Sequence, residues 1–168
     1  LGVLATCSLL GVLGFAPGSA AQTLPESAPP LPEVVLQTGH SAKILALIPS
    51  PDGRWLASAS LDWTVKVWEA GTGRELRTLR GHRAPVEAVA VSADGRWLAS
   101  GSHDGTVKVW EVATGREVRT LSGHTNQVLA IAISADGRWL ASGGHDKTVR
   151  LWEVATGREV RRFEEHSG

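Results

Sequence analysis

The sequence predicts an all-β fold built from three four-stranded antiparallel sheets, one for each of three repeats. Gly-His pairs recur at residues 39–40, 81–82 and 123–124, a step of 42 residues. A Trp-Glu pair and the stretch Asp-Gly-Arg-Trp-Leu-Ala-Ser recur at the same step. Repetition with a period of about 20–50 residues is typical of proteins that arrange copies of one structural unit side by side.

The second repeat shows how one unit divides into four strands. Its apolar segments alternate with polar residues or are rich in β-branched residues, as strands are, and turn sequences separate them. His103-Asp104-Gly105 is a tight turn of the Asp-Gly kind that joins the two strands of a hairpin. Ser92 to Gly95 and Ala113 to Arg116 mark the other two turns. The predicted strands are residues 86–91, 97–101, 106–112 and 117–121.

Composition limits the classes of function. Lys and Arg together equal Asp and Glu in number, so the formal net charge is zero. No segment forms the basic stripe that is typical of nucleic-acid-binding proteins. The single cysteine, Cys7, allows neither an internal disulfide nor a Cys-based zinc site. We therefore expect a partner other than nucleic acid.

Residues 1–21 have the pattern of a secretory signal peptide. Residues 1–16 are almost wholly apolar, and a Pro-Gly pair and three small residues follow. The apolar run is shorter than the roughly 20 residues of a membrane span, and an uncleaved anchor is the alternative. Cys7 fits a small apolar residue of the leader better than a lipoprotein signal. Residues 22–33 carry four prolines and are predicted to form an extended linker. We expect an exported protein, periplasmic or extracellular.

The pattern of each repeat resembles the WD40 family. A Gly-His pair near the start, a Ser-x-x-x-Asp pair in the middle and a Trp-acidic end recur in register from Val34 to the end of the chain. Glu stands where the family has Asp after each Trp. The resemblance implies WD40 β-propeller blades at residues 39–80, 81–122 and 123–164 of an exported, bacterial-type member. It also implies no cofactor, no metal and no enzymatic activity.

Each repeat contains His, Ser and Asp, the residue types of a hydrolase triad. In the family these residues form, with the Trp, a buried hydrogen-bond chain inside each blade. Three copies at identical spacing favour this structural role, because a catalytic site is expected once in a chain. The residues that the resemblance assigns to these tetrads are His40, Ser58, Asp62, Trp68, His82, Ser100, Asp104, Trp110, His124, Ser142, Asp146 and Trp152.

The family often binds proteins through the narrow top face of the propeller. That face is formed by the loop into the first strand of each blade and by the turn between its second and third strands. The three repeats differ from one another at the positions that point there. We therefore expect a scaffold that binds a protein or peptide through these residues: Lys43, Leu45, Leu61, Trp63, Pro85, Glu87, His103, Gln127, Leu129 and His145.

Some of these residues have a second interpretation. His103 and His145 could suggest a metal, but exposed turn histidines fit better, since Leu61 stands at the same place in the first repeat. Trp63 could contact a partner or pack against a neighbouring loop. The Arg-Glu pairs that begin the fourth segment of each repeat are interpreted as a solvated strand edge.

Three blades do not close a propeller, which typically has about 4–8. Val34 to Gln37 is predicted to be the strand that completes the last blade of a ring, and Glu165-His166 resembles the start of a fourth repeat. We therefore expect a fragment of a longer product whose further blades complete the ring, with a homo-oligomer as the alternative. An alternative function is the propeller portion of a larger exported enzyme or sensor whose effector domain is not in this chain.

Overall fold

The computed structural model describes residues 39–164. The predicted signal peptide, the proline-rich linker and the strand expected at Val34 to Gln37 lie outside these residues. The resemblance of Glu165-His166 to a fourth repeat also falls outside them. These predictions therefore stay predictions.

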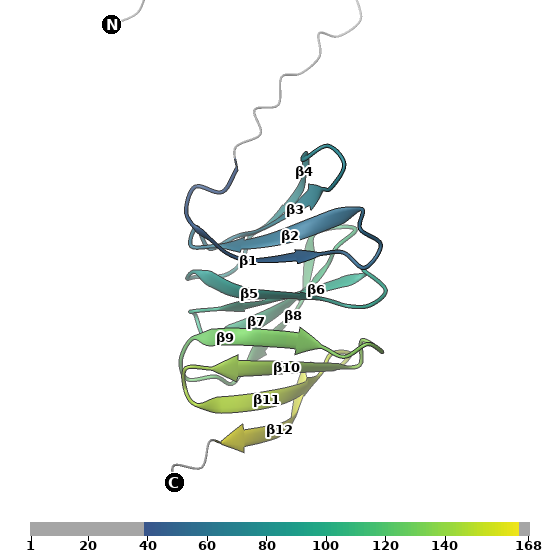
Figure 1. The fold of residues 1–168 in the computed structure, drawn as a ribbon. Coiled ribbons are helices and arrows are strands. Elements are labelled where there is room, and N and C mark those ends of the chain that lie inside the picture. The colour runs from purple at the N-terminus through teal and green to yellow at the C-terminus, as the bar shows by residue number, and fades with distance from the viewer. Residues whose placement is uncertain (1–38, 165–168) are drawn as a thin grey trace, which may run out of the picture. The chain divides into compact units, whose positions relative to one another are not determined.

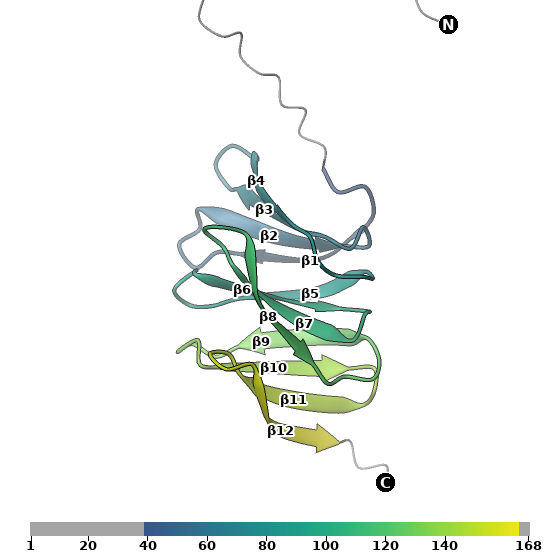
Figure 2. The same ribbon diagram turned by 180° about the vertical axis from the view of Figure 1, so that it is seen from behind.

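The described residues form twelve strands in three four-stranded antiparallel sheets, with no helix among them (Figures 1 and 2). The prediction of an all-β fold with one sheet per repeat is confirmed. Each sheet is here called a blade. Blade 1 contains β1 (Ile44–Pro49), β2 (Trp55–Ser60), β3 (Val65–Glu69) and β4 (Glu75–Leu79); blade 2 contains β5 (Val86–Val91), β6 (Trp97–Ser102), β7 (Thr106–Glu111) and β8 (Arg116–Ser122); blade 3 contains β9 (Val128–Ile133), β10 (Trp139–Gly144), β11 (Thr148–Glu153) and β12 (Arg158–Glu164).

The strands of blade 2 differ from their predicted bounds by one residue at several ends. β6 reaches Ser102 because this residue pairs with Val86 of β5. β8 begins at Arg116, which pairs with Glu111 of β7. β7 ends one residue early, because the Val112 N–H donates to the Arg96 carbonyl and leaves the β7–β8 ladder. Cross-strand partners therefore set these ends.

The core lies between blades rather than inside one blade. Each blade has a leading face, turned towards the preceding blade in the chain, and a trailing face, turned towards the following one. Blade 1 contributes five buried residues of its trailing face to the first junction, and blade 2 contributes Val86, Leu98 and Trp110 of its leading face. The second junction repeats this arrangement with Val128, Leu140 and Trp152 of blade 3. Apolar burial at these junctions is the main stabilising term available to such thin sheets.

Candidate functional site

Blade 2 contains a hydrogen-bond chain that joins β6 and β7 to the loop before β5 and to the β6–β7 turn. The Trp110 indole N–H donates to Ser100 Oγ at 2.8 Å. Ser100 Oγ lies 2.8 Å from His82 Nε2, and His82 Nδ1 lies 2.9 Å from Asp104 Oδ2. The ionised Asp104 carboxylate can only accept, so His82 Nδ1–H donates to it. In that tautomer Nε2 accepts the serine hydroxyl, whose oxygen accepts the indole N–H. Every member of the chain thus has a partner of the right polarity.

The same chain is present in blades 1 and 3. The distances from Trp to Ser, Ser to His and His to Asp are 2.8, 2.6 and 2.8 Å in blade 1 and 2.8, 2.8 and 2.9 Å in blade 3. The structure therefore brings together all twelve residues assigned to the tetrads. Among the described residues, no buried side-chain nitrogen or oxygen lacks a hydrogen-bond partner. Burial of these polar groups consequently leaves no uncompensated desolvation cost.

The aspartate of each hydrogen-bond chain also holds the loop before the first strand and the turn that contains the aspartate itself. The backbone N–H groups of Arg83 and Thr106 both donate to the Asp104 carboxylate, as does the Thr106 hydroxyl. In blade 1, burial raises the pKa of Asp62, but hydrogen bonds from Thr64, His40 and nearby backbone N–H groups outweigh it and lower the pKa to about 2. The carboxylates are thus held ionised, as the acceptors of several donors.

The three serines are not placed to act as nucleophiles. Ser58, Ser100 and Ser142 are at most 1% exposed, and each Oγ already accepts an indole N–H. A catalytic nucleophile has to reach the reacting carbon of a substrate, and these oxygens lie inside the sheets. The arrangement is suited to tying strands and loops together.

Sequence analysis missed an ion pair beside each of the three hydrogen-bond chains. Lys108, buried on β7, contacts Glu117 of β8 at 2.9 Å, and Arg150 of β11 contacts Glu159 of β12 at 2.7 Å. Lys66 and Glu75 form the equivalent pair in blade 1. The Arg-Glu pairs were interpreted as a solvated strand edge; their arginines are exposed, and each glutamate also pairs with a cation that is buried on the third strand. Period-two alternation, which places Lys108 on the same face of β7 as the buried Trp110, was the available signal.

The predicted top-face residues are held together by backbone hydrogen bonds. In blade 2 the N–H of His103, just before the turn aspartate, donates to the carbonyl of Pro85 at 2.9 Å. The equivalent bonds join Leu61 to Lys43 at 2.9 Å and His145 to Gln127 at 2.7 Å. The loop into the first strand and the turn between the second and third strands therefore form one surface in each blade.

In each blade, a β-bulge in the first strand changes the direction of one further side chain. The register of the first strand against the second shifts at Leu45 in blade 1, at Glu87 in blade 2 and at Leu129 in blade 3. A bulge inserts one residue into a ladder and re-aims its side chain. These are three of the residues predicted for the top face, and only the tertiary pairing shows that each is bulged.

Polar contacts occupy the rim of blade 2. His103 Nε2 lies 3.0 Å from Glu87 Oε2, and both side chains are half-buried. The expectation of an exposed turn histidine was therefore wrong for His103, because Glu87 covers one ring edge. In blade 3, His145 is exposed, and its Nδ1 lies 3.3 Å from Asn126 Nδ2. Within residues 39–164, no three His, Cys, Asp or Glu side chains are grouped as metal ligands would be.

Blade 1 presents an apolar rim instead. Trp63 is 50% exposed and Leu61 is 37% exposed, on either side of the anchored Asp62. Lys43 is exposed and Leu45 is half-buried beside them. Trp63 also has a φ of 70°, in the left-handed region, where blade 2 has Gly105 with a φ of 79°. A bulky side chain in this conformation is uncommon and costs backbone energy.

No helix in the described part of the chain is long and apolar enough to cross a membrane.

The family model described as "WD domain, G-beta repeat" matches residues 33–69, 73–111 and 115–153. Among curated proteins, the chain is 55% identical over 51 residues to ribosome biogenesis protein BOP1 of Rattus norvegicus, and 54% identical over 58 residues to ribosome biogenesis protein ERB1 of Ajellomyces capsulatus. These matches cover 30% and 33% of this chain but 7% of each relative. The chain thus spans only a small part of the length of these relatives.

Two solved structures match over most of the described residues. Structures titled "Structure of U3-55K" and "Crystal structure of RRP9 WD40 repeats" superpose with a TM-score of 0.74 at 30% identity. Each match covers 77% of this chain and 42% or 41% of the other chain.

These comparisons correct the expectation of export. The matching curated relatives are ribosome biogenesis proteins of eukaryotes, which contradicts a periplasmic or extracellular location. The same finding leaves the signal peptide, the bacterial-type assignment and the exported enzyme or sensor without support. The apolar composition of residues 1–21 led to the expectation, and composition alone does not distinguish a leader from other apolar segments.

Proposed function

Because the chain belongs to the WD40 repeat family, we propose that it is a non-catalytic scaffold that binds a protein or peptide through its top face, with the turn around Trp63 as the main contact. The buried tetrads hold the loops of that face in place.

The observation that carries this proposal is the backbone of Trp63. The turn accepts glycine in blade 2, and glycine enters the left-handed region without steric cost. Blade 1 instead places a half-exposed Trp there, with a φ of 70°. Trp is enriched among the residues that contribute most to protein interfaces. A half-exposed aromatic residue in a left-handed turn supports a contact site there.

The chemistry of the partner follows from the rim of blade 1. Leu61 and Trp63 offer apolar contact, and Lys43 supplies one positive charge beside them. In blade 2, by contrast, Glu87 and His103 bind each other. A protein segment with an apolar side chain and an adjacent carboxylate would complement this surface. The zero net charge of the chain favours such a segment over nucleic acid.

A matched pair of glycine variants tests the proposal. Trp63→Gly removes the aromatic ring and relieves the backbone, so we expect the free energy of unfolding to stay equal or to rise by about 1 kcal/mol. Lys147→Gly relieves the same turn in blade 3, where φ is 63°, without removing an aromatic ring. Proteins captured from a native extract by the three chains are compared by quantitative mass spectrometry.

We expect a protein that the wild type and Lys147→Gly retain and that Trp63→Gly loses, with a decrease in affinity of roughly 30-fold for the purified pair. Equal retention by all three chains would show that Trp63 is not the contact. Loss in both variants would assign the effect to the turn backbone rather than to the aromatic ring.

A further inference from the structure

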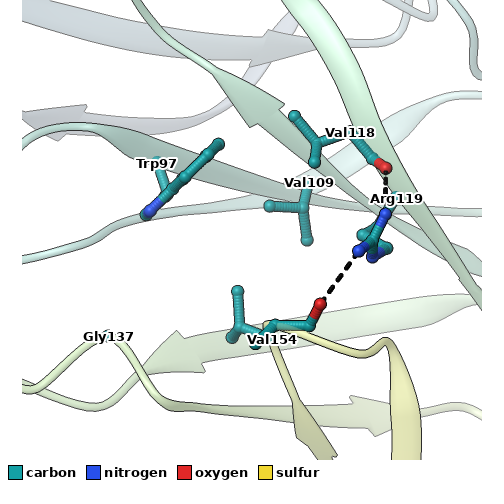
Figure 3. Close-up of a pocket in the computed structure, with 7 residues that line it drawn as sticks. Trp97, Val109, Val118, Arg119, Gly137 and Val154 are labelled. Carbon is teal, nitrogen blue, oxygen red and sulfur yellow. Dashed lines mark hydrogen bonds between the residues drawn. The ribbon is translucent and has the colours of Figure 1, made fainter.

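The junctions between blades contain a pocket that neither the tetrads nor the top face use. Between blades 2 and 3 it has a volume of about 200 Å³, and its lining includes Trp97, Val109, Val118, Arg119 and Val154. Trp97 and Arg119 lie on opposite sides of it, with Val109 between them (Figure 3). Trp97, Val118 and Val154 are half-buried, so the pocket presents apolar side chains that are still in contact with solvent.

The same pocket recurs one repeat earlier, between blades 1 and 2. There its volume is about 350 Å³, and its lining includes Trp55, Val67, Leu76, Arg77 and Val112. Each of these residues stands 42 positions before the corresponding residue of the other pocket. The pocket is therefore a property of the packed junction rather than of one blade.

Both pockets lie at the end of the blades opposite to the top face. Gly95 and Gly137, in the turns between the first and second strands, line them, as do Ala113 and Ala155, which follow the third strands. The top face is formed by the turns between the second and third strands instead. A partner in these pockets would consequently leave Trp63 untouched, so the two sites are separate.

A β-bulge in the fourth strand places two successive residues in each pocket. The register of β8 against β7 shifts between Val109 and Trp110, and Val118 is left without a partner in the ladder. Successive side chains of a regular strand point to opposite faces, whereas Val118 and Arg119 both line the pocket. β4 has the same shift, at Leu76. The bulge thus combines an apolar wall with a cation.

The arginine of each pocket is held in place but is not neutralised. Arg119 donates to the carbonyls of Val118 at 3.1 Å and of Ala155 at 2.9 Å (Figure 3). Arg77 donates to the equivalent carbonyls of blades 1 and 2 at 2.7 and 3.0 Å. Neither guanidinium forms an ion pair with a carboxylate of residues 39–164. A guanidinium has five N–H donors, so further donors and the positive charge remain for a ligand.

The carboxylates nearby along the chain already have partners. Glu117 of the same strand binds the buried Lys108 at 2.9 Å. Glu111, at the end of β7, accepts a hydrogen bond from Thr114 and lies 3.8 Å from Arg96. An apolar pocket whose cation has no internal counter-ion is complementary to an apolar group that carries a carboxylate beside it.

We propose that these two pockets bind an acidic segment of a partner protein, with one apolar side chain of the segment in each pocket and a neighbouring Asp or Glu on its arginine. The planar guanidinium matches a carboxylate, and burial of the apolar side chain against the walls adds to the affinity. The smaller pocket is below the roughly 300–1,000 Å³ of small-molecule sites, and its repetition suits successive side chains of one segment. This contact does not depend on the one proposed for Trp63.

The indole N–H signals of the tryptophans test the proposal on the full chain by NMR. The probe is the synthetic peptide acetyl-Asp-Leu-Asp-Leu-Asp-amide, titrated into isotope-labelled protein. We expect saturable shifts of the Trp97 and Trp55 signals, because both indoles line the pockets. The Trp63 signal reports on the top face in the same titration.

Two matched peptides separate the contributions of charge and of apolar burial. Replacing the three Asp residues of the probe by Asn removes its negative charges, and replacing the two Leu residues by Ala removes the side chains that would fill the pockets. Each control peptide is expected to bind roughly tenfold more weakly than the probe.

Variants of the protein assign the binding to one pocket. Arg119→Gln removes the cation and should weaken the response of Trp97 by roughly tenfold, while the response of Trp55 stays unchanged and shows that the chain is folded. Arg83→Gln removes an exposed arginine of the loop before β5 and should change neither response. Val118→Phe fills the same pocket, and Leu76 at the equivalent place shows that a larger side chain fits there. It should also weaken the response of Trp97.

Three outcomes would overturn the proposal. Equal binding of the probe and of either control peptide would show that the pockets do not recognise an acidic, apolar segment. Unchanged responses of Trp97 in both Arg119→Gln and Val118→Phe would place the peptide elsewhere. A shift of the Trp63 signal alone would assign the acidic segment to the top face, which would support the proposed function and refute this second site.

Discussion

Blade 2 and blade 3 have nearly the same sequence, yet the same positions have different surroundings in the two blades. Blade 2 is packed on both faces, whereas blade 3 is packed only on its leading face within the described residues. The apolar pattern of a repeat therefore encodes two faces that can pack, and the neighbours decide how much stability each side chain contributes. Two predictions test how the neighbouring blades set these contributions, and a third concerns the turn aspartates.

The largest difference is expected at the end of the fourth strand. Leu121→Ala should lower the free energy of unfolding by about 3 kcal/mol, because it leaves a cavity in a buried junction. Phe163→Ala removes a larger side chain, but from an exposed face, and should cost less than about 1 kcal/mol. Denaturant titration at a concentration where the mass is that of one chain provides the measurement. Equal costs would mean that the trailing face of blade 3 is covered even in the monomer.

The second difference concerns the hydrogen-bond chains. Ser100→Ala leaves the indole N–H of the fully buried Trp110 without its acceptor, at a cost of about 2 kcal/mol. Ser58→Ala does the same in blade 1, where Trp68 is only half-buried and water can replace the hydroxyl, so about 1 kcal/mol is expected. Thermal unfolding of the two variants compares them. A larger loss for Ser58→Ala would contradict the effect of the neighbouring blade.

The third prediction, with the smallest expected effect near neutral pH, concerns the protonation of the turn aspartates at low pH. The pKa of Asp62 falls from 3.8 to about 2 in the folded chain. A lowered pKa stabilises the fold above the unfolded value, and this contribution is lost as the pH falls from about 4 towards 2. Asp62→Asn should therefore reduce the slope of unfolding free energy against pH in that range. An unchanged slope, measured by denaturant titration at several pH values, would contradict the assignment.

Repetition made much of the fold predictable. Gly-His, Ser-x-x-x-Asp and Trp-Glu pairs at constant spacing were sufficient to predict four strands per repeat, because strand length, turn chemistry and cross-strand partners are local or nearly local properties. The Lys108–Glu117 ion pair was missed, since charged side chains are usually read as solvated. The Glu87–His103 contact joins a residue of β5 to a residue of the β6–β7 turn and needed the tertiary structure to bring them together.

The sequence by itself determined the strand order within each blade, the turns and the residue types that can satisfy one another inside it. Only the tertiary structure decided which faces are covered, which residues the bulges re-aim and that Trp63 is held half-exposed in a left-handed turn. The physical reason is that alternation and turn propensity act within a few residues, whereas burial depends on the blade that packs against a face, about forty residues away in the sequence.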